Sequence, residues 1–239
     1  MTNRQSVIRT FAARADGYDD EFSWIHDEDF IRDLVPAPFG DGQFLDVCAG
    51  TGAVACLAEK MGWHTTATDI SAEMMQKIPS SICRVVADVC RLPLEENAFE
   101  AVACRQGLQY VHLETALAEL RRVAKKEVRL AHITIHSEED YRFWKDYFAI
   151  ASPGRVNVFL PDQIPAVAKQ IGYKTAQTSL KISEESYVSS IMHLPEAERK
   201  ILIDRFLSAS PAFLKRNHIT ISQNDIRGER RWEYTLLKK

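Results

Sequence analysis

Two glycines in the first half of the chain have the spacing of a nucleotide-binding turn. Gly50 and Gly52 follow the apolar run Phe44-Leu45 and precede a stretch with helical spacing. Glycine adopts positive φ angles and lets the backbone approach a ligand, while the first turn of a helix presents unpaired N–H groups to the same place. Together with Asp69, this pattern also fits a dinucleotide site. The glycines therefore indicate a nucleotide without identifying it.

Three acids indicate which nucleotide binds, because each of them follows a short apolar strand. Asp46, Asp69 and Asp88 end such strands, and the carboxyl ends of parallel strands share one edge of a sheet. Singly, each acid also fits a helix cap or a turn. An acid before the glycines faces pyrophosphate unfavourably, but Asp46 suits the ammonium of an amino-acid tail, Asp69 a ribose diol and Asp88 an adenine amine. These preferences describe S-adenosylmethionine.

The same motifs resemble those of the class I S-adenosylmethionine-dependent methyltransferases, in particular the small-molecule group that includes ubiquinone and menaquinone biosynthesis enzymes. Residues 45–52 are similar to the first family motif, residues 67–71 with Met74 to the second, and residues 87–89 to the third. The family's Pro-Gly-Gly before the fifth strand is absent. The Asn/Asp-Pro-Pro-Tyr/Phe signature of enzymes that methylate amino groups of nucleic acids is absent as well. We therefore do not expect methylation of adenine or cytosine amines.

The resemblance implies S-adenosyl-L-methionine as the cofactor and assigns residues to it. Ile70 and Val89 are expected as apolar faces around the adenine, and the backbone of Arg105 and Gln106 below the methionine part. Tyr18 matches a family tyrosine that covers the cofactor. The expected cofactor-binding residues are Tyr18, Asp46, Ala49, Gly50, Gly52, Asp69, Ile70, Met74, Asp88, Val89, Arg105 and Gln106.

Few residues need to take part in the chemistry, because methyl transfer from a sulfonium is an in-line displacement that mainly requires positioning of the reactants and exclusion of water. A phenol or amine acceptor is helped by a general base, whereas an acidic carbon or a carboxylate needs none. His112 and then Tyr110, which follow the fourth strand, are the expected catalytic residues. A histidine at a helix start is also often exposed or a cap.

Other residues are candidates for the acceptor side. His132 and His136 share one face of the fifth strand, so either both face the cofactor end or both pack beneath a helix. No cluster has the spacing of a metal site. The remaining acceptor-side candidates are Tyr18, Trp24, His26 and Gln109.

The composition is that of a globular protein with one substantial core. The chain has 239 residues, of which 46% are hydrophobic and 26% charged, and a single domain is expected over residues 1–239. The net charge of −3 offers no overall attraction to nucleic acid. The absence of a long apolar run and of a Cys-x-x-Cys pair argues for a cytoplasmic protein without membrane association. The oligomeric state stays open.

Alternating short strands and helical stretches over residues 43–135 predict the cofactor-binding core of a doubly wound α/β fold. We expect a Rossmann-like, seven-stranded, mostly parallel sheet with an antiparallel last strand. A helical cap is expected over residues 1–40 and a helical insertion over residues 183–218, before the last strand. Both segments concentrate apolar side chains, so we expect them to form a lid over the acceptor.

The leading hypothesis is a methyltransferase that acts on a small biosynthetic acceptor, by O-, N- or C-methylation. The aromatic cap and the apolar insertion favour an apolar or aromatic acceptor. Two alternatives remain open: the bound sulfonium serves a cyclisation or decarboxylation without methyl transfer, or the chain is a catalytically silent binding subunit.

Overall fold

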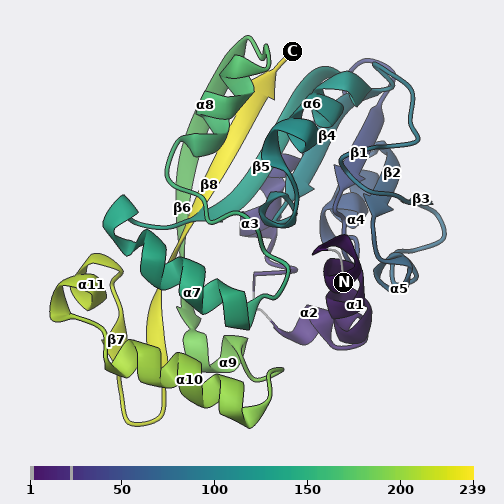
Figure 1. The fold of residues 1–239 in the computed structure, drawn as a ribbon. Coiled ribbons are helices and arrows are strands. Elements are labelled where there is room, and N and C mark those ends of the chain that lie inside the picture. The colour runs from purple at the N-terminus through teal and green to yellow at the C-terminus, as the bar shows by residue number, and fades with distance from the viewer. Residues whose placement is uncertain (1–2, 22–23) are drawn as a thin grey trace.

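An eight-stranded sheet forms the centre of the computed structural model, which describes residues 3–21 and 24–239 (Figure 1). The strand order is β3-β2-β1-β4-β5-β8-β6, and β7 pairs with β8 off this path. Neighbours from β3 to β5 are parallel, while β8 is antiparallel to both β5 and β6, so the expected fold is confirmed. The strands are β1 (Gln43–Val47), β2 (His64–Asp69), β3 (Cys83–Val86), β4 (Phe99–Arg105), β5 (Ala124–Thr134), β6 (Thr175–Ser186), β7 (Thr220–Ile221) and β8 (Ile226–Lys238).

Helices cover both faces of the sheet, with α6 and α8 on one face and α3 and α4 on the other (Figure 1). The α-helices are α1 (Asn3–Arg14), α2 (Tyr18–Glu21), α3 (Glu28–Ile31), α4 (Ala53–Lys60), α5 (Ala72–Met75), α6 (Leu113–Val123), α7 (Tyr141–Ala151), α8 (Gln163–Gln170), α9 (Tyr187–Ser190), α10 (Glu196–Leu207) and α11 (Pro211–Arg216). Short 3-10 helices are η1 (Arg32–Leu34), η2 (Leu108–Tyr110) and η3 (Glu138–Asp140). None of the helices in the described ranges is long and apolar enough to cross a membrane.

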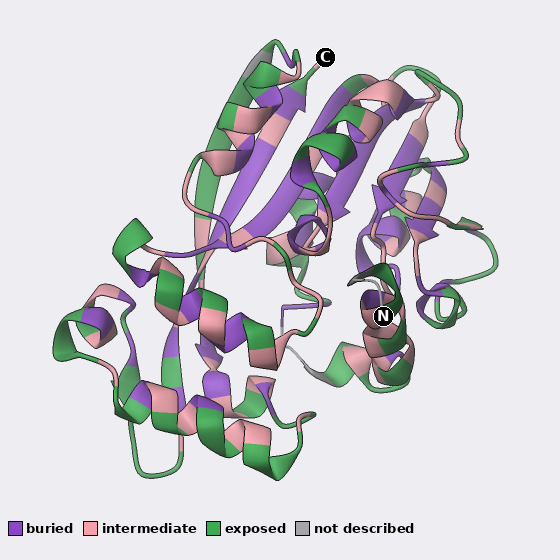
Figure 2. Cartoon of the chain, viewed as in Figure 1, coloured by how far each residue is buried: buried purple, intermediate pink, exposed green. Residues whose placement is uncertain are grey.

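The alternation of side chains along the strands explains the two layers of helices. In β1, Leu45 and Val47 pack into the core beneath α6 and α8, whereas Phe44 packs on the opposite side with Val54 of α4. Successive side chains of a strand point to opposite faces, so a strand buried on both faces is apolar throughout. Figure 2 shows the central strands buried along most of their length. The polar Asp46 within such a strand is therefore an exception that calls for a functional reason.

The strands β6 and β8 extend past the end of β5 and carry a further group of helices. β5 pairs with β8 only as far as Arg231, whereas β6 pairs with β8 as far as Arg227. This overhang of β6 and β8 supports α7 and the helices α9 to α11 below the sheet (Figure 1). A separate aromatic core joins them, and its large buried rings are Trp144, Tyr147, Phe148, Tyr187, Phe206 and Phe213.

Candidate functional site

The turn after β1 is built from residues with positive φ. Cys48, Gly50 and Gly52 have φ values of 55°, 57° and 90°. A Cβ added at Gly52 would lie 2.8 Å from Cγ1 of Ile78, so this position accepts no side chain unless Ile78 shifts. Gly52 is also the residue before α4, whose first-turn N–H groups face the strand edge. The sequence pattern thus produces a tight turn into a helix start.

Asp69 fastens this turn from the neighbouring strand β2. Its Oδ2 accepts a hydrogen bond from the N–H of Gly50 and its Oδ1 one from the N–H of Ser71, both at 2.9 Å. Burial raises the pKa of Asp69 above its usual value. Asp88, which follows β3, forms an ion pair of 3.2 Å with Nε of Arg4 from α1. Asp69 and Asp88 therefore face the same edge, and each connects two parts of the chain there.

Asp46 is buried at the end of β1 and accepts a hydrogen bond from the N–H of Ala55, at 2.9 Å, through Oδ2. Burial raises the pKa of Asp46 to about 7, although the nearby guanidinium of Arg105 acts in the opposite direction. Arg105 donates hydrogen bonds to the carbonyls of Trp24 at 3.2 Å and Ile25 at 2.9 Å. It thereby fixes the N-terminal segment over this edge of the sheet.

Most of the residues expected to bind the cofactor meet at two adjoining cavities. The larger, of about 370 Å³, we call the cofactor cavity, and the expected residues that line it include Tyr18, Gly50, Asp69, Ile70, Asp88 and Val89. A smaller one beside it, which we call the tail cavity, is lined by Asp46, Ala49 and Gly50 among others. Arg105 and Gln106 line both.

Two expected cofactor contacts are not found at either cavity. Met74 is fully buried in α5, where its N–H donates to the side chain of the capping residue Ser71, and its side chain packs inward. Gly52 lies against Ile78 and shapes the turn without lining a cavity. The prediction that Met74 contacts the cofactor is therefore corrected: the motif position serves the core.

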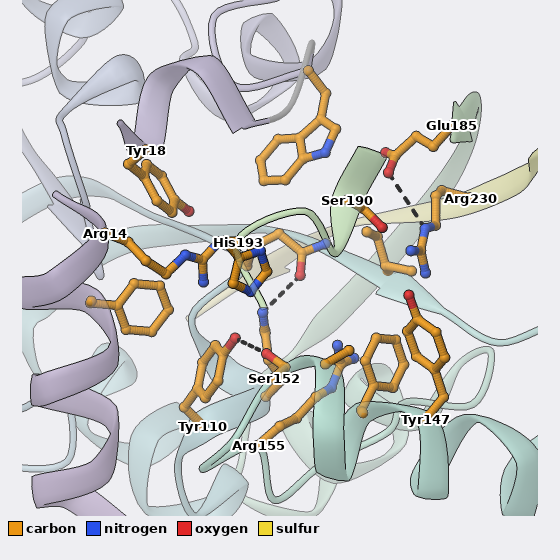
Figure 3. A pocket seen from close by; sticks show the side chains of 17 residues that line it. Arg14, Tyr18, Tyr110, Tyr147, Ser152, Arg155, Glu185, Ser190, His193 and Arg230 are labelled. Carbon is orange, nitrogen blue, oxygen red and sulfur yellow. Dashed lines mark hydrogen bonds and ion pairs between the residues drawn. The ribbon is translucent and has the colours of Figure 1, made fainter. Parts of the chain in front are cut away.

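A third cavity, of about 100 Å³, lies between α1, η2, α7 and the overhang of β6 and β8 (Figure 3). We call it the acceptor cavity, because Trp24, Gln109 and Tyr110 from the expected acceptor side line it. Phe11, Tyr18, Gln106 and Tyr110 also line the cofactor cavity, and Tyr18 and Gln106 line all three cavities. This shared boundary is where two ligands could touch.

The two expected catalytic residues have different surroundings. The hydroxyl of Tyr110 lies 2.6 Å from Oγ of Ser152, and Tyr110 borders both the cofactor and the acceptor cavity. The side chain of His112 is 73% exposed, and its Nδ1 lies 2.9 Å from Oγ1 of Thr115. His112 borders the cofactor cavity beside Asp88 and does not reach the acceptor cavity. The geometry favours Tyr110 and corrects the order of the prediction.

The other expected histidines line none of the three cavities. His132 is buried, with Nε2 3.4 Å from Glu233 and its ring edge-on to Phe159, and it packs beneath α8. His136 is half-buried, its pKa lowered by burial, and it lies beside the ring of His218. His26 is exposed and lies 3.2 Å from Asp19. All three histidines therefore contact neighbouring side chains of the chain and lie away from the three cavities.

Sequence reasoning missed a set of polar and charged side chains on the acceptor cavity. These residues come from α1, α7, the following loop, β6, the insertion and β8, and they are Arg14, Tyr147, Arg155, Glu185, His193 and Arg230. One signal was available, because Arg230 is a charge on the face of β8 that also carries the buried residues Ile226, Trp232 and Tyr234. Its side chain is buried and lies 3.6 Å from Glu185. Among the described residues, no group of three or more His, Cys, Asp or Glu could hold a metal ion.

Comparison with known proteins identifies the cofactor-binding part of the chain. Residues 45–132 match the family described as methyltransferase domain. The ubiquinone/menaquinone biosynthesis C-methyltransferase UbiE of Burkholderia mallei is 37% identical over 102 residues, which cover 35% of this chain and 39% of that protein. An uncharacterized protein of Methanocaldococcus jannaschii is 28% identical over 94 residues, or 39% of this chain and 41% of that one. The chain thus spans about two fifths of these relatives.

Solved structures share the fold at lower sequence identity. The YcgJ protein of Bacillus subtilis is 18% identical with a TM-score of 0.77, covering 87% of this chain and 94% of that one. Phosphoethanolamine N-methyltransferase 2 of Haemonchus contortus, in complex with phosphomonomethylethanolamine and S-adenosylhomocysteine, is 19% identical with a TM-score of 0.62, covering all of this chain and 60% of that one. The resemblance inferred from the sequence motifs is confirmed.

Proposed function

From a chain whose residues 45–132 belong to the methyltransferase domain family, we propose an enzyme that transfers a methyl group from S-adenosylmethionine to a small molecule. One observation carries the proposal: the cofactor and acceptor cavities meet at a boundary of four side chains, Phe11, Tyr18, Gln106 and Tyr110. Two ligands bound in these adjoining cavities would be close neighbours, which is what a direct transfer requires.

The residues at the strand ends suit S-adenosylmethionine. Asp46 is a buried carboxylate in the tail cavity, where it can hold an ammonium. Asp69 and Asp88 border the cofactor cavity and offer acceptor oxygens for a ribose diol and an adenine amine. Ile70 and Val89 supply the apolar surface that an adenine ring needs. The cavity volume of about 370 Å³ leaves room for a ligand of this class.

The bound cofactor supplies an electrophilic methyl group on a sulfonium. The chain's own residues then position the acceptor and exclude water from the boundary. Tyr18 and Phe11, held over the turn by the hydrogen bond between Thr51 and Asp19 at 2.5 Å, close it from the N-terminal side. The Tyr110 hydroxyl, oriented by Ser152, is placed to accept a hydrogen bond from an acceptor hydroxyl or amine. As the acceptor passes its proton to Tyr110, the Tyr110 proton passes to Oγ of the partly exposed Ser152 and from there to solvent.

The acceptor cavity of about 100 Å³ suits a small acceptor. The sequence favoured an apolar or aromatic acceptor, but the walls of this cavity are partly polar. Aromatic rings of Trp24, Tyr147 and Phe148 lie beside charged side chains there. The charged side chains are Arg14 of α1, Arg155 of the loop after α7 and Arg230 of β8. The acceptor we propose therefore has both an apolar and a polar part.

The proposal is tested with S-adenosylmethionine that carries a deuterated methyl group. The protein is incubated with this cofactor and a small-molecule extract, and the mixture is analysed by mass spectrometry. We expect release of S-adenosylhomocysteine and a small molecule that has gained the labelled methyl group, and less of both from the Asp69→Ala variant at the same limiting cofactor concentration. Cofactor binding without any S-adenosylhomocysteine release would contradict methyl transfer and leave the non-methylating enzyme or the silent subunit.

A further inference from the structure

One wall of the acceptor cavity carries a guanidinium without an acidic partner. Arg155 donates its Nε–H to the carbonyl of Asn157 at 2.8 Å, and its guanidinium carbon lies 3.8 Å from the centroid of the Phe148 ring. Within residues 3–21 and 24–239, no carboxylate pairs with Arg155. Burial lowers the pKa of Arg155 to about 10, so the side chain stays charged at neutral pH. Arg155 is half-buried, and a partly desolvated charge without a counter-ion is less favourable than one that a ligand anion pairs.

The remaining charges of the cavity leave it positive. Nε of Arg230 lies 3.6 Å from Oε2 of Glu185, and the Arg230 guanidinium stacks on the ring of Tyr187 at 4.4 Å from its centroid. Glu185 is the only acid among the described residues that line the cavity, and Arg230 neutralises it (Figure 3). Arg14 of α1 also lines the cavity. The charge of Arg155 is therefore not balanced by the wall around it.

Arg155 is held in place by the loop that contains it. The backbone N–H groups of Val156 and Asn157 both donate to the carbonyl of Gln109, at 2.8 and 3.0 Å. The side-chain amide of Asn157 donates to the carbonyls of Leu108 and Val111, at 2.8 and 2.7 Å. This loop is thus fastened to η2, the element that carries Tyr110. A charge fixed before binding loses little conformational entropy when a ligand arrives.

We propose that the methyl acceptor carries an anionic group, a carboxylate or a phosphate, and that Arg155 binds it. The inference rests on the proposed function and names its substrate class. A guanidinium presents parallel N–H groups that match the oxygens of either anion. Because the Arg155 loop and Tyr110 are fastened together, the anion and the methylated atom belong to one small molecule. The rings of Tyr147 and Phe148 contact the apolar skeleton between them.

The experiment measures anion binding directly, with the protein saturated by S-adenosylhomocysteine. The probes are benzoate, its uncharged isostere benzamide, and inorganic phosphate, each titrated by calorimetry. We expect benzoate or phosphate to bind the wild-type protein at least about tenfold more tightly than benzamide, as for a charge-assisted hydrogen bond. Tighter binding of benzoate identifies a carboxylate acceptor, and tighter binding of phosphate identifies a phosphate acceptor.

Substitutions assign the anion to Arg155. Arg155→Gln is expected to weaken anion binding at least about tenfold, and Arg155→Lys less, because lysine keeps the charge without the fork. Arg32→Gln is the matched control, since Arg32 is exposed, pairs with Glu28 and lines none of the cavities. S-adenosylhomocysteine affinity and the melting temperature should be unchanged in all three variants.

Two results would overturn the inference. The first is that neither anion binds better than benzamide to a wild-type protein that does bind S-adenosylhomocysteine. The second is that a folded Arg155→Gln variant keeps the full anion affinity. A wild-type protein that does not bind S-adenosylhomocysteine would instead refute the proposed function itself, so the two failures are distinguishable.

Discussion

The cofactor side and the acceptor side of the site differ in how their residues are brought together. The acids and glycines of the cofactor side come from the ends of adjacent parallel strands, over residues 46–88. The acceptor cavity collects residues from Phe11 in α1 to Arg230 in β8. A site at strand ends follows from local patterns and one sheet edge, whereas a site between helices and the overhang of β6 and β8 depends on how the whole chain packs.

The two sides also differ in charge. On the cofactor side, the carboxylates of Asp46, Asp69 and Asp88 are accompanied by two arginines, Arg4 and Arg105, so acids outnumber arginines there. On the acceptor side, Arg14, Arg155 and Arg230 outnumber the one acid that lines the described cavity, Glu185. With the anionic acceptor proposed above, this difference in charge would favour a cationic cofactor on one side and the acceptor on the other. The comparison teaches that the balance of charge, as well as shape, can differ between two cavities that share a boundary of aromatic and amide side chains.

The largest expected effect belongs to the boundary itself. Tyr110→Phe removes the hydroxyl of a residue that borders both cavities, and we expect kcat to fall by about 10²- to 10⁴-fold, the usual effect of losing acid–base assistance. His112→Ala serves as the comparison, because His112 borders only the cofactor cavity, and its effect should stay below roughly threefold. Cofactor affinity should be nearly constant in both. The reverse order in steady-state kinetics would restore His112 as the base.

The next effect concerns the cofactor side alone. Asp69→Ala should weaken S-adenosylmethionine binding by about 1.5 to 3 kcal/mol, because it removes a charged hydrogen-bond acceptor. Calorimetry measures this change, with Asp20→Ala as a control at an exposed acid that lines none of the cavities. Equal affinity in the Asp69→Ala and Asp20→Ala variants would mean that Asp69 only fastens the Gly50 turn.

A smaller effect is the pH dependence that Asp46 imposes. Its pKa is about 7 in the folded protein, against 3.8 for an unperturbed aspartate, so the free protein binds an extra proton between those values and its stability falls as pH rises from 4 to 7. An ammonium needs the carboxylate, so cofactor affinity should weaken by up to about tenfold per pH unit below 7. Calorimetry of the wild-type protein and Asp46→Asn checks this, since the variant should lose both slopes. A wild-type slope retained in Asp46→Asn would assign the titration elsewhere.

The smallest effect distinguishes the two segments that we expect to form a lid, the N-terminal cap and the insertion over residues 183–218. Phe11 and Tyr18 touch the cofactor cavity, whereas Ser190 and His193 of the insertion touch only the acceptor cavity. S-adenosylhomocysteine alone should therefore slow hydrogen exchange in α1 and α2 severalfold and leave residues 187–193 unchanged, until acceptor is added. Protection of both segments by S-adenosylhomocysteine alone would show that the lids close together.

The sequence predicted the cofactor side better than the acceptor side for a physical reason. Strand alternation, glycine turns and strand-end acids are local signals, so the sheet, its antiparallel last strand and the positions of Asp46, Asp69 and Asp88 could be predicted. Met74 shows the limit, because a motif position does not say whether its side chain points to a ligand or to the core. Arg155 and Glu185 have no local signal, since the loop after α7 and the overhang of β6 meet only in the folded chain.

The account's central claim is that the reacting methyl group lies at the boundary between the cofactor and acceptor cavities. The most direct test is a crystal structure of the complex with S-adenosylhomocysteine. The account predicts the sulfur next to Tyr18, Gln106 and Tyr110, with the amino-acid tail directed to Asp46 and the adenine to Asp88. A sulfur beside His112, away from the acceptor cavity, would contradict it.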